Sequence, residues 1–97
     1  MRIVWSPLAA ASVEAIRSRL AAYSSKAASD FVGSLDQRVR QLELFPESGR
    51  LVPEYGLPLL RELVEAPYRI AYEVFPDRIE IVIVRHGREQ FEREQGG

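Results

Sequence analysis

The first half of the chain carries two stripes of apolar residues at helical spacing. The first predicts an amphipathic helix over about residues 7–23, with Ser6 as N-cap and Pro7 in the first turn, where its missing N–H costs nothing. A break at residues 24–25 separates it from a second helix that ends at Pro46. The stripes are Ala9, Val13, Ile16, Leu20 and Tyr23, and then Ala28, Phe31, Leu35, Val39, Leu42 and Phe45. So short a connection predicts an antiparallel helix hairpin.

The second half of the chain changes to the two-residue alternation of strands. Three strands are expected, over Leu60–Glu65, Tyr68–Phe75 and Arg78–Arg85. The break at Ala66-Pro67 and the turn at Pro76-Asp77 are short, so the three strands should form an antiparallel meander. Before them, residues 46–58 are rich in Pro, Gly and polar residues and form the one long connection, with turns at 46–50 and 53–56.

A further short strand, rich in β-branched and aromatic residues, is expected at Arg2–Trp5. The order of elements is therefore β-α-α-β-β-β, an α+β fold with the helix hairpin on one face of the sheet. The rows that should meet the helices are Ile70, Tyr72 and Val74, and Ile79, Ile81 and Ile83. The rows left on the open face are Arg69, Glu73, Glu80, Val82 and Val84, and function is expected there. In the first of the three strands, Leu60 and Val64 compete with Leu63 for the inward row.

Composition restricts the class of protein. Ninety-seven residues, 46% hydrophobic and 28% charged, predict one soluble globular domain, with residues 88–97 as a charged tail that is mobile or forms a short helix around Phe91. No apolar run approaches the roughly 20 residues of a membrane span. With no cysteine and one histidine there is no disulfide framework and no metal set, and no cofactor is expected. The absence of cysteine is compatible with a reducing cytoplasm.

The charge balance bears on nucleic-acid binding. Domains that bind nucleic acid usually carry a basic excess, because each neutralised phosphate needs a nearby cation. This chain has a formal net charge of −1. Twelve of its thirteen cations are arginine, which suits bidentate contacts with carboxylate or phosphate, so a local basic patch stays open.

The sequence resembles the ParE/RelE toxin superfamily over nearly its whole length. The matching pieces are Ile3-Val4-Trp5 followed by Ser6-Pro7, and the segments 42–50, 60–64, 68–74 and 79–88. The most specific part is the series Phe45-Pro46, Gly49-Arg50, Tyr68-Arg69 and His86-Gly87. The resemblance implies a small cytoplasmic toxin, neutralised by a cognate antitoxin that lays its C-terminal segment over it, in a heterotetramer or larger complex. RelE-like members cut mRNA in the ribosomal A site, whereas ParE-like members poison DNA gyrase.

The chemistry at the end of the last strand favours the ParE-like branch. A nuclease of this type must activate a 2′-hydroxyl, stabilise charge on phosphate and protonate the leaving oxygen. The residues for that chemistry would be Arg69, Arg85 and His86. No tyrosine follows His86, so the acid–base set looks incomplete, and the ending His86-Gly87-Arg88 resembles ParE-type members more. No catalytic residue is therefore favoured.

Three functions stay open at this point. The favoured one is a toxin that inhibits DNA gyrase by protein–protein contact. The alternatives are a ribosome-dependent mRNA endoribonuclease and a degenerate toxin that only binds an antitoxin. The residues expected to bind the target or the antitoxin are Arg61, Arg69, Val82, Val84, Arg85, His86 and Arg88.

Each of these residues also has a plainer structural role. His86 could be a hydrogen-bonded histidine at a strand end, Arg69 could pair with Glu73 or Glu80, and Arg61 could pair with a neighbouring glutamate. Trp5, Tyr68 and Tyr72 are expected to be packing residues first.

Overall fold

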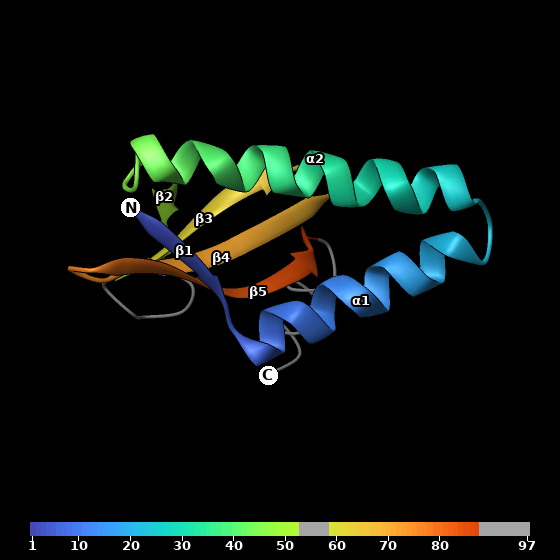
Figure 1. Cartoon of the computed structure of the whole chain (residues 1–97), viewed down its shortest axis with the longest axis horizontal. Coiled ribbons are helices and arrows are strands. Elements are labelled where there is room, and N and C mark those ends of the chain that lie inside the picture. Colours follow the sequence, from blue (N-terminus) through green and yellow to red (C-terminus); the bar gives the residue numbers. More distant parts are fainter. Residues whose placement is uncertain (53–58, 88–97) are drawn as a thin grey trace.

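A helix hairpin covers one face of a mixed β-sheet in the computed structural model, which describes residues 1–52 and 59–87 (Figure 1). The elements are β1 (Arg2–Trp5), α1 (Pro7–Ala21), α2 (Ser25–Leu44), β2 (Arg50–Leu51), β3 (Leu60–Glu65), β4 (Tyr68–Val74) and β5 (Arg78–His86). The expected α+β fold is confirmed. Arg50, expected in a turn, instead begins a short strand with Leu51 inside the long connection. The predicted turn at 53–56, the tail from residue 88 onward and Arg88 itself lie outside the described residues.

The two helices begin and pack as their stripes predict. The Ser6 hydroxyl accepts from the Ala9 N–H at 3.0 Å, and the Ser24 hydroxyl accepts from the Ala27 N–H at 3.1 Å. The buried stripe residues are Ala9, Ile16, Ala28, Phe31, Leu35, Val39 and Leu42. The last residue of each predicted stripe is an exception, because the helix ends just before it. Tyr23 is 87% exposed and Phe45 is 62% exposed, so both predictions of burial are wrong.

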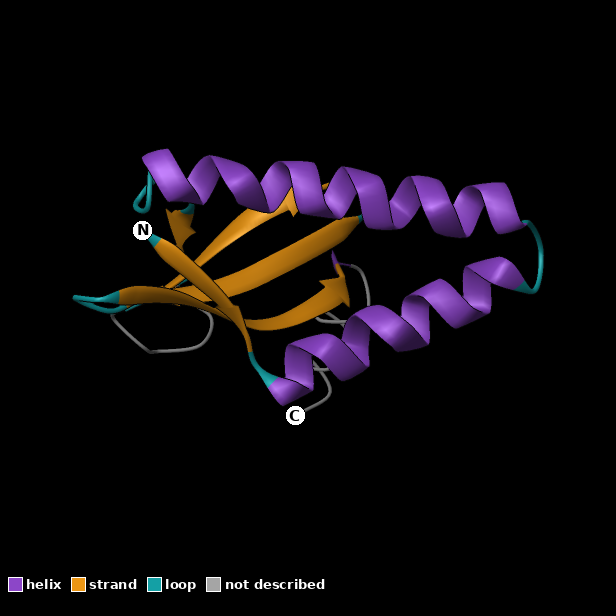
Figure 2. Cartoon of the chain, viewed as in Figure 1, coloured by secondary structure: helices purple, strands orange, loops and turns teal. Residues whose placement is uncertain are grey.

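The sheet has the order β1-β5-β4-β3-β2 (Figure 2). β3, β4 and β5 form the predicted antiparallel meander, with Ala66-Pro67 as the turn between β3 and β4. β1 joins it by pairing parallel to β5, because the helix hairpin returns the chain to the other edge of the sheet. Leu63 belongs to the core and Val64 is 49% exposed, which decides the inward row of β3 in favour of Leu63.

A β-bulge in β5 reverses its alternation. Ala71 pairs with Ile83 and Tyr72 pairs with Ile81, so Val82 has no partner in β4. Before the bulge, Ile79 and Ile81 lie under the helices as predicted. After it, Val84 is the core residue, at 2% exposure, and Ile83 takes the opposite face. The predicted places of Ile83 and Val84 are therefore wrong.

Two serines of the first helix region hold the bulge in place. The Ser6 N–H donates to the Ile81 carbonyl at 3.0 Å, and its hydroxyl donates to the Val82 carbonyl at 2.9 Å. The Ser12 hydroxyl accepts from the Val84 N–H at 3.0 Å. Backbone groups that the irregular pairing takes out of the strand ladder are thus satisfied by α1 and its cap.

Gly49 fixes the path of the chain from α2 into β2. Its N–H donates to the buried Tyr72 hydroxyl at 2.8 Å, and its carbonyl accepts from Arg61 Nη1 at 2.9 Å. A Cβ at this position would lie 2.5 Å from the Tyr72 oxygen and 2.6 Å from the Glu62 carbonyl oxygen. Only glycine allows this approach, and it places Arg50 beside β3.

Replacing Gly49 by alanine should therefore destabilise the fold, by about 1–3 kcal/mol or more in urea denaturation, because the methyl group overlaps backbone and a buried ring. Gly33→Ala is the matched control. Gly33 lies inside α2 with nothing within 4 Å of a built Cβ, so alanine there should stabilise by up to about 1 kcal/mol. Equal effects at the two glycines would contradict this account of Gly49.

A second prediction concerns alkaline pH. Burial raises the pKa of the Tyr72 hydroxyl above its usual value of about 10. The folded state then favours the protonated phenol, so its contribution to stability is complete below pH ~10 and is lost as the pH rises through the raised pKa. Tyr72→Phe should cost about 1 kcal/mol at neutral pH, and the difference from wild type should shrink in alkaline solution. A difference that stays constant in chemical denaturation above pH ~10 would refute this.

Candidate functional site

A cluster of charged side chains occupies the sheet face opposite the helices, the far face. One oxygen of the Glu62 carboxylate, Oε1, accepts from Arg50 Nε at 2.8 Å and Nη2 at 2.6 Å, and from Arg69 Nη2 at 2.9 Å. The other, Oε2, accepts from Arg69 Nε at 2.7 Å. The side chains of Glu62 and Arg69 are 1% and 6% exposed, whereas that of Arg50 is 55% exposed. One carboxylate thus holds two guanidinium groups.

Strand register brings these residues together. Arg50 pairs with Glu62, and Arg69 lies opposite Arg85 and Val64 in the neighbouring row. Arg50, Glu62, Arg69 and Arg85 are the far-face cluster. Its centre is buried, so the expectation that Arg69 is exposed on this face is wrong, whereas Glu73 and Glu80 are partly exposed there. The expected pairing of Arg69 with Glu73 or Glu80 is also replaced by the pair with Glu62.

Gly87 closes the cluster at the end of β5. Its N–H donates to the Pro67 carbonyl at 2.9 Å, and a Cβ there would lie 3.1 Å from Arg69 Cδ. A larger residue would press on the stem of Arg69. The Gly of the His86-Gly87 pair therefore has a packing role beside the buried arginine.

The helix-covered side of the sheet receives two of the predicted site residues. The His86 ring meets the Tyr68 ring edge-on, with centroids 5.8 Å apart, and Tyr68 in turn packs against Phe31 at 4.9 Å. Arg61 donates to the carbonyls of Glu47 and Gly49 at 3.2 Å and 2.9 Å. Its guanidinium also lies 3.9 Å from the Glu47 carboxylate, which confirms the predicted pairing with a nearby glutamate.

The predicted set of site residues is thus divided between the two faces. Arg69 and Arg85 lie together on the far face, Arg61 and His86 lie on the helix side, Val82 forms the bulge and Val84 is in the core. Sequence reasoning missed Glu62 and Arg50. The available signal was the charge alternation in Arg61-Glu62 beside Arg69, but only the strand register shows which of these side chains share a face.

Two apolar cavities flank the helix hairpin. The first, the hairpin groove, has a volume of about 290 Å³ and is lined by Trp5, Ala10, Val13, Glu14, Val32, Leu35 and Asp36. Its two carboxylates bond to arginines of their own helices, Glu14 to Arg17 and Asp36 to Arg40. Trp5 packs partly buried against the core, as expected. The groove therefore presents an apolar floor with already neutralised acidic rims.

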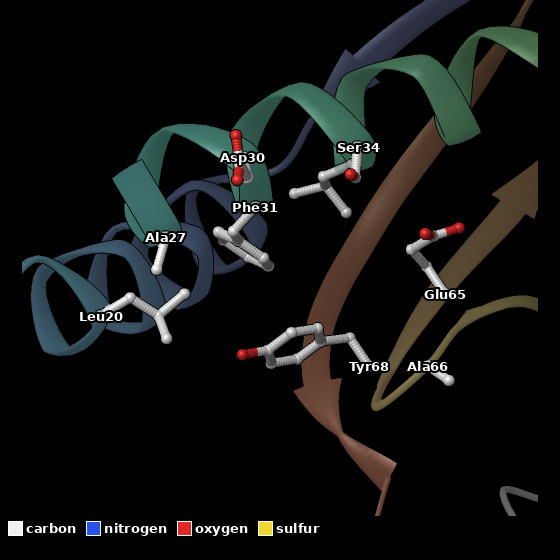
Figure 3. Close-up of a pocket in the computed structure, with 9 residues that line it drawn as sticks. Leu20, Ala27, Asp30, Phe31, Ser34, Glu65, Ala66 and Tyr68 are labelled. Carbon is white, nitrogen blue, oxygen red and sulfur yellow. The ribbon is translucent and has the colours of Figure 1, made fainter. Parts of the chain in front are cut away.

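The second cavity, the end pocket, has a volume of about 350 Å³ and lies where the hairpin approaches the turn between β3 and β4. Figure 3 shows Tyr68 across from Leu20 and Phe31, with Asp30 and Glu65 at the sides. Leu35 lines both cavities. The two cavities are therefore adjacent, with Leu35 between them on α2.

The described residues contain neither a metal-ligand cluster nor a membrane-spanning helix. Within 1–52 and 59–87, no group of three or more His, Asp or Glu could hold a metal ion. No helix in these ranges is long and apolar enough to cross a membrane.

Comparisons with known proteins agree with the resemblance noted in the sequence. The family model described as "ParE toxin of type II toxin-antitoxin system, parDE" matches residues 3–91. Among solved structures, the chain is similar to one titled "Chromosomal ParDE TA system from P. aeruginosa", with a TM-score of 0.75 and 23% identity. The match covers 89% of this chain and 95% of that chain. No curated protein matches the chain.

The buried pair yields a prediction about stability. Glu62→Ala leaves the Arg69 guanidinium without its buried carboxylate, and should lower the free energy of unfolding by about 3–5 kcal/mol in urea denaturation. Glu14→Ala, which breaks the exposed pair with Arg17, should change little. The double variant Glu62→Leu with Arg69→Met should recover much of the loss, since it leaves no buried charge unpaired. Equal losses for the Glu62 and Glu14 variants would contradict the assignment.

Proposed function

Because the chain belongs to the ParE toxin family of type II toxin–antitoxin systems, we propose that it inhibits DNA gyrase by protein–protein contact and that a cognate antitoxin neutralises it. The hydrogen bonding of Arg69 is the observation that favours protein–protein contact over RNA cleavage. Its Nε and Nη2 are both bound to a buried carboxylate, so this guanidinium is held away from a phosphate.

The position of His86 supports the same choice. A nuclease of this superfamily would need an acid or base within hydrogen-bonding reach of the substrate proton that it transfers, on the same face as the arginines that hold the phosphate. His86 instead lies on the helix side, edge-on to Tyr68, while Arg69 and Arg85 lie on the far face. The three residues considered for catalysis therefore do not face one common substrate atom.

The hairpin groove is the proposed seat of the antitoxin. It combines a volume of about 290 Å³ with an apolar floor, and Val32 in its lining is 39% exposed. Further apolar side chains, Leu8 and Leu44, are 56% and 78% exposed on the same two helices. An amphipathic segment laid on the hairpin would bury this surface. Val84, once expected to be covered by the partner, is already inside the core.

Two assays with purified protein test the target. Gyrase supercoiling should slow, or cleaved DNA should accumulate, while mRNA on ribosomes stays intact. His86→Gln should retain the effect on gyrase, because the proposed action needs no proton transfer, whereas removal of a catalytic proton donor costs roughly 10²–10⁴-fold. Variants must be compared at matched folded concentration, judged by circular dichroism.

The opposite result would assign the nuclease function. Codon-specific cleavage of ribosome-bound mRNA that disappears in His86→Gln, with gyrase unaffected, would overturn the proposal. A chain that inhibits neither gyrase nor translation but still binds an antitoxin would be a degenerate toxin.

A further inference from the structure

Arg85 is a cation without an acceptor in the described part of the chain. It forms no hydrogen bond or ion pair with residues 1–52 or 59–87, and its Nε is buried with no hydrogen-bond partner. A buried donor left unsatisfied is costly, more so on a charged group, and native proteins keep few of them. Such a group in a native structure needs an explanation, and an acceptor supplied by a bound partner is one.

The cluster itself cannot supply that acceptor. Glu62 already accepts from two arginines and uses both oxygens. The other carboxylates of the far face belong to Glu73 and Glu80. These two residues lie opposite each other on β4 and β5, several residues along the strands from Arg85. Glu80 there lies 3.7 Å from Arg78.

The row of the far face that contains Arg85 continues through Arg69 on β4 to Val64 on β3. Val64, in the same row as Arg69 and Arg85, is 49% exposed. Ile83 and Val82 precede Arg85 on β5 and are partly buried. A ligand for Arg85 therefore meets a guanidinium between the paired Arg69 and the aliphatic Ile83, with Val64 one strand beyond Arg69.

We propose that Arg85 binds a carboxylate side chain of the antitoxin, an Asp or Glu flanked by apolar residues that cover Val64 and Ile83. This rests on the proposed function, which supplies the partner. A carboxylate offers two oxygens to the planar guanidinium, and the bond replaces the acceptor that the buried Nε lacks. The far face thus recognises the partner by charge, at a place separate from the hairpin groove.

An acidic peptide fits this surface better than a nucleic acid does. A phosphate backbone is bound by several cations in a row, and it does not cover aliphatic side chains. Here Arg85 lies opposite Arg69, whose charge is already paired with Glu62, in a chain whose formal net charge is −1. The centre of the neighbouring row is a closed ion pair, Glu62 with Arg69.

The test uses Arg85→Met, which keeps the aliphatic stem and removes every N–H. The probe is the protein encoded by the reading frame next to that of this chain, and binding is measured by titration calorimetry at low and at physiological ionic strength. Arg85→Met should weaken binding by at least about 30-fold, since a buried charged pair is lost, and should reduce the salt dependence. The free variant should melt at the wild-type temperature or above it, because an unsatisfied buried donor is gone.

Arg78→Met is the matched control. Arg78 lies on the same strand and face, but its guanidinium already contacts Asp77 at 3.0 Å and stacks over Phe75 at 4.2 Å. Its removal should leave the affinity unchanged. A charge reversal adds an independent arm: Arg85→Glu should abolish binding, and one Asp→Arg or Glu→Arg change in the probe protein should restore it.

The outcomes separate the two proposals. If the wild-type chain does not bind the probe protein, the proposed antitoxin partner fails and the inference fails with it. If wild type binds and Arg85→Met binds equally well, only the inference fails. It also fails if Arg85→Met lowers the melting temperature without weakening binding, or if the variant instead loses affinity for a fluorescent DNA duplex.

Discussion

The bulge at Val82 is the constraint on which the arrangement of both faces depends. In a regular strand the inward row of β5 would continue from Ile79 and Ile81 to residues 83 and 85, which would place the Arg85 guanidinium under the helices. One extra residue moves Val84 into the core and Arg85 to the far face. The bulge persists because Ser6, the N-cap of α1, donates to the Val82 carbonyl at 2.9 Å. The same serine therefore caps α1 and stabilises the bulge in β5.

The same shift separates chemistry that a nuclease would combine. It places His86 on the helix side, beside Tyr68, and leaves Arg69 and Arg85 together on the other side of the sheet. Glu62 then completes the separation by binding Arg69 through both carboxylate oxygens. Buried ion pairs of this kind are weak contributors to stability relative to apolar packing, but they fix side chains in one geometry. A face organised in this way is suited to recognition.

The sequence predicted most of the elements and the antiparallel meander of β3, β4 and β5, but not the register that decides which side chains share a face. Helical periodicity and serine caps gave both helices, since each stripe has a clear polar side. In β5, however, residues 81–84 are all Ile or Val, so hydrophobicity is the same in either register and the bulge leaves no trace. The role of Glu62 could not be predicted for a related reason. Its ion-pair partners depend on the cross-strand register, which a single sequence does not specify. Arg50 belonged to a segment whose Gly content indicated only a turn.

The two candidate surfaces differ in the physical means by which they would hold a partner. In the hairpin groove the rim carboxylates are already paired within their helices, Glu14 with Arg17 and Asp36 with Arg40, so the groove attracts through apolar area and shape. On the far face the guanidinium of Arg85, whose buried Nε has no acceptor, attracts through charge. Apolar burial gives affinity to many amphipathic segments, whereas a partly buried cation disfavours a segment that lacks an acid at the right place. A partner that wraps from one surface to the other would therefore gain its strength at the helices and its selectivity at Arg85.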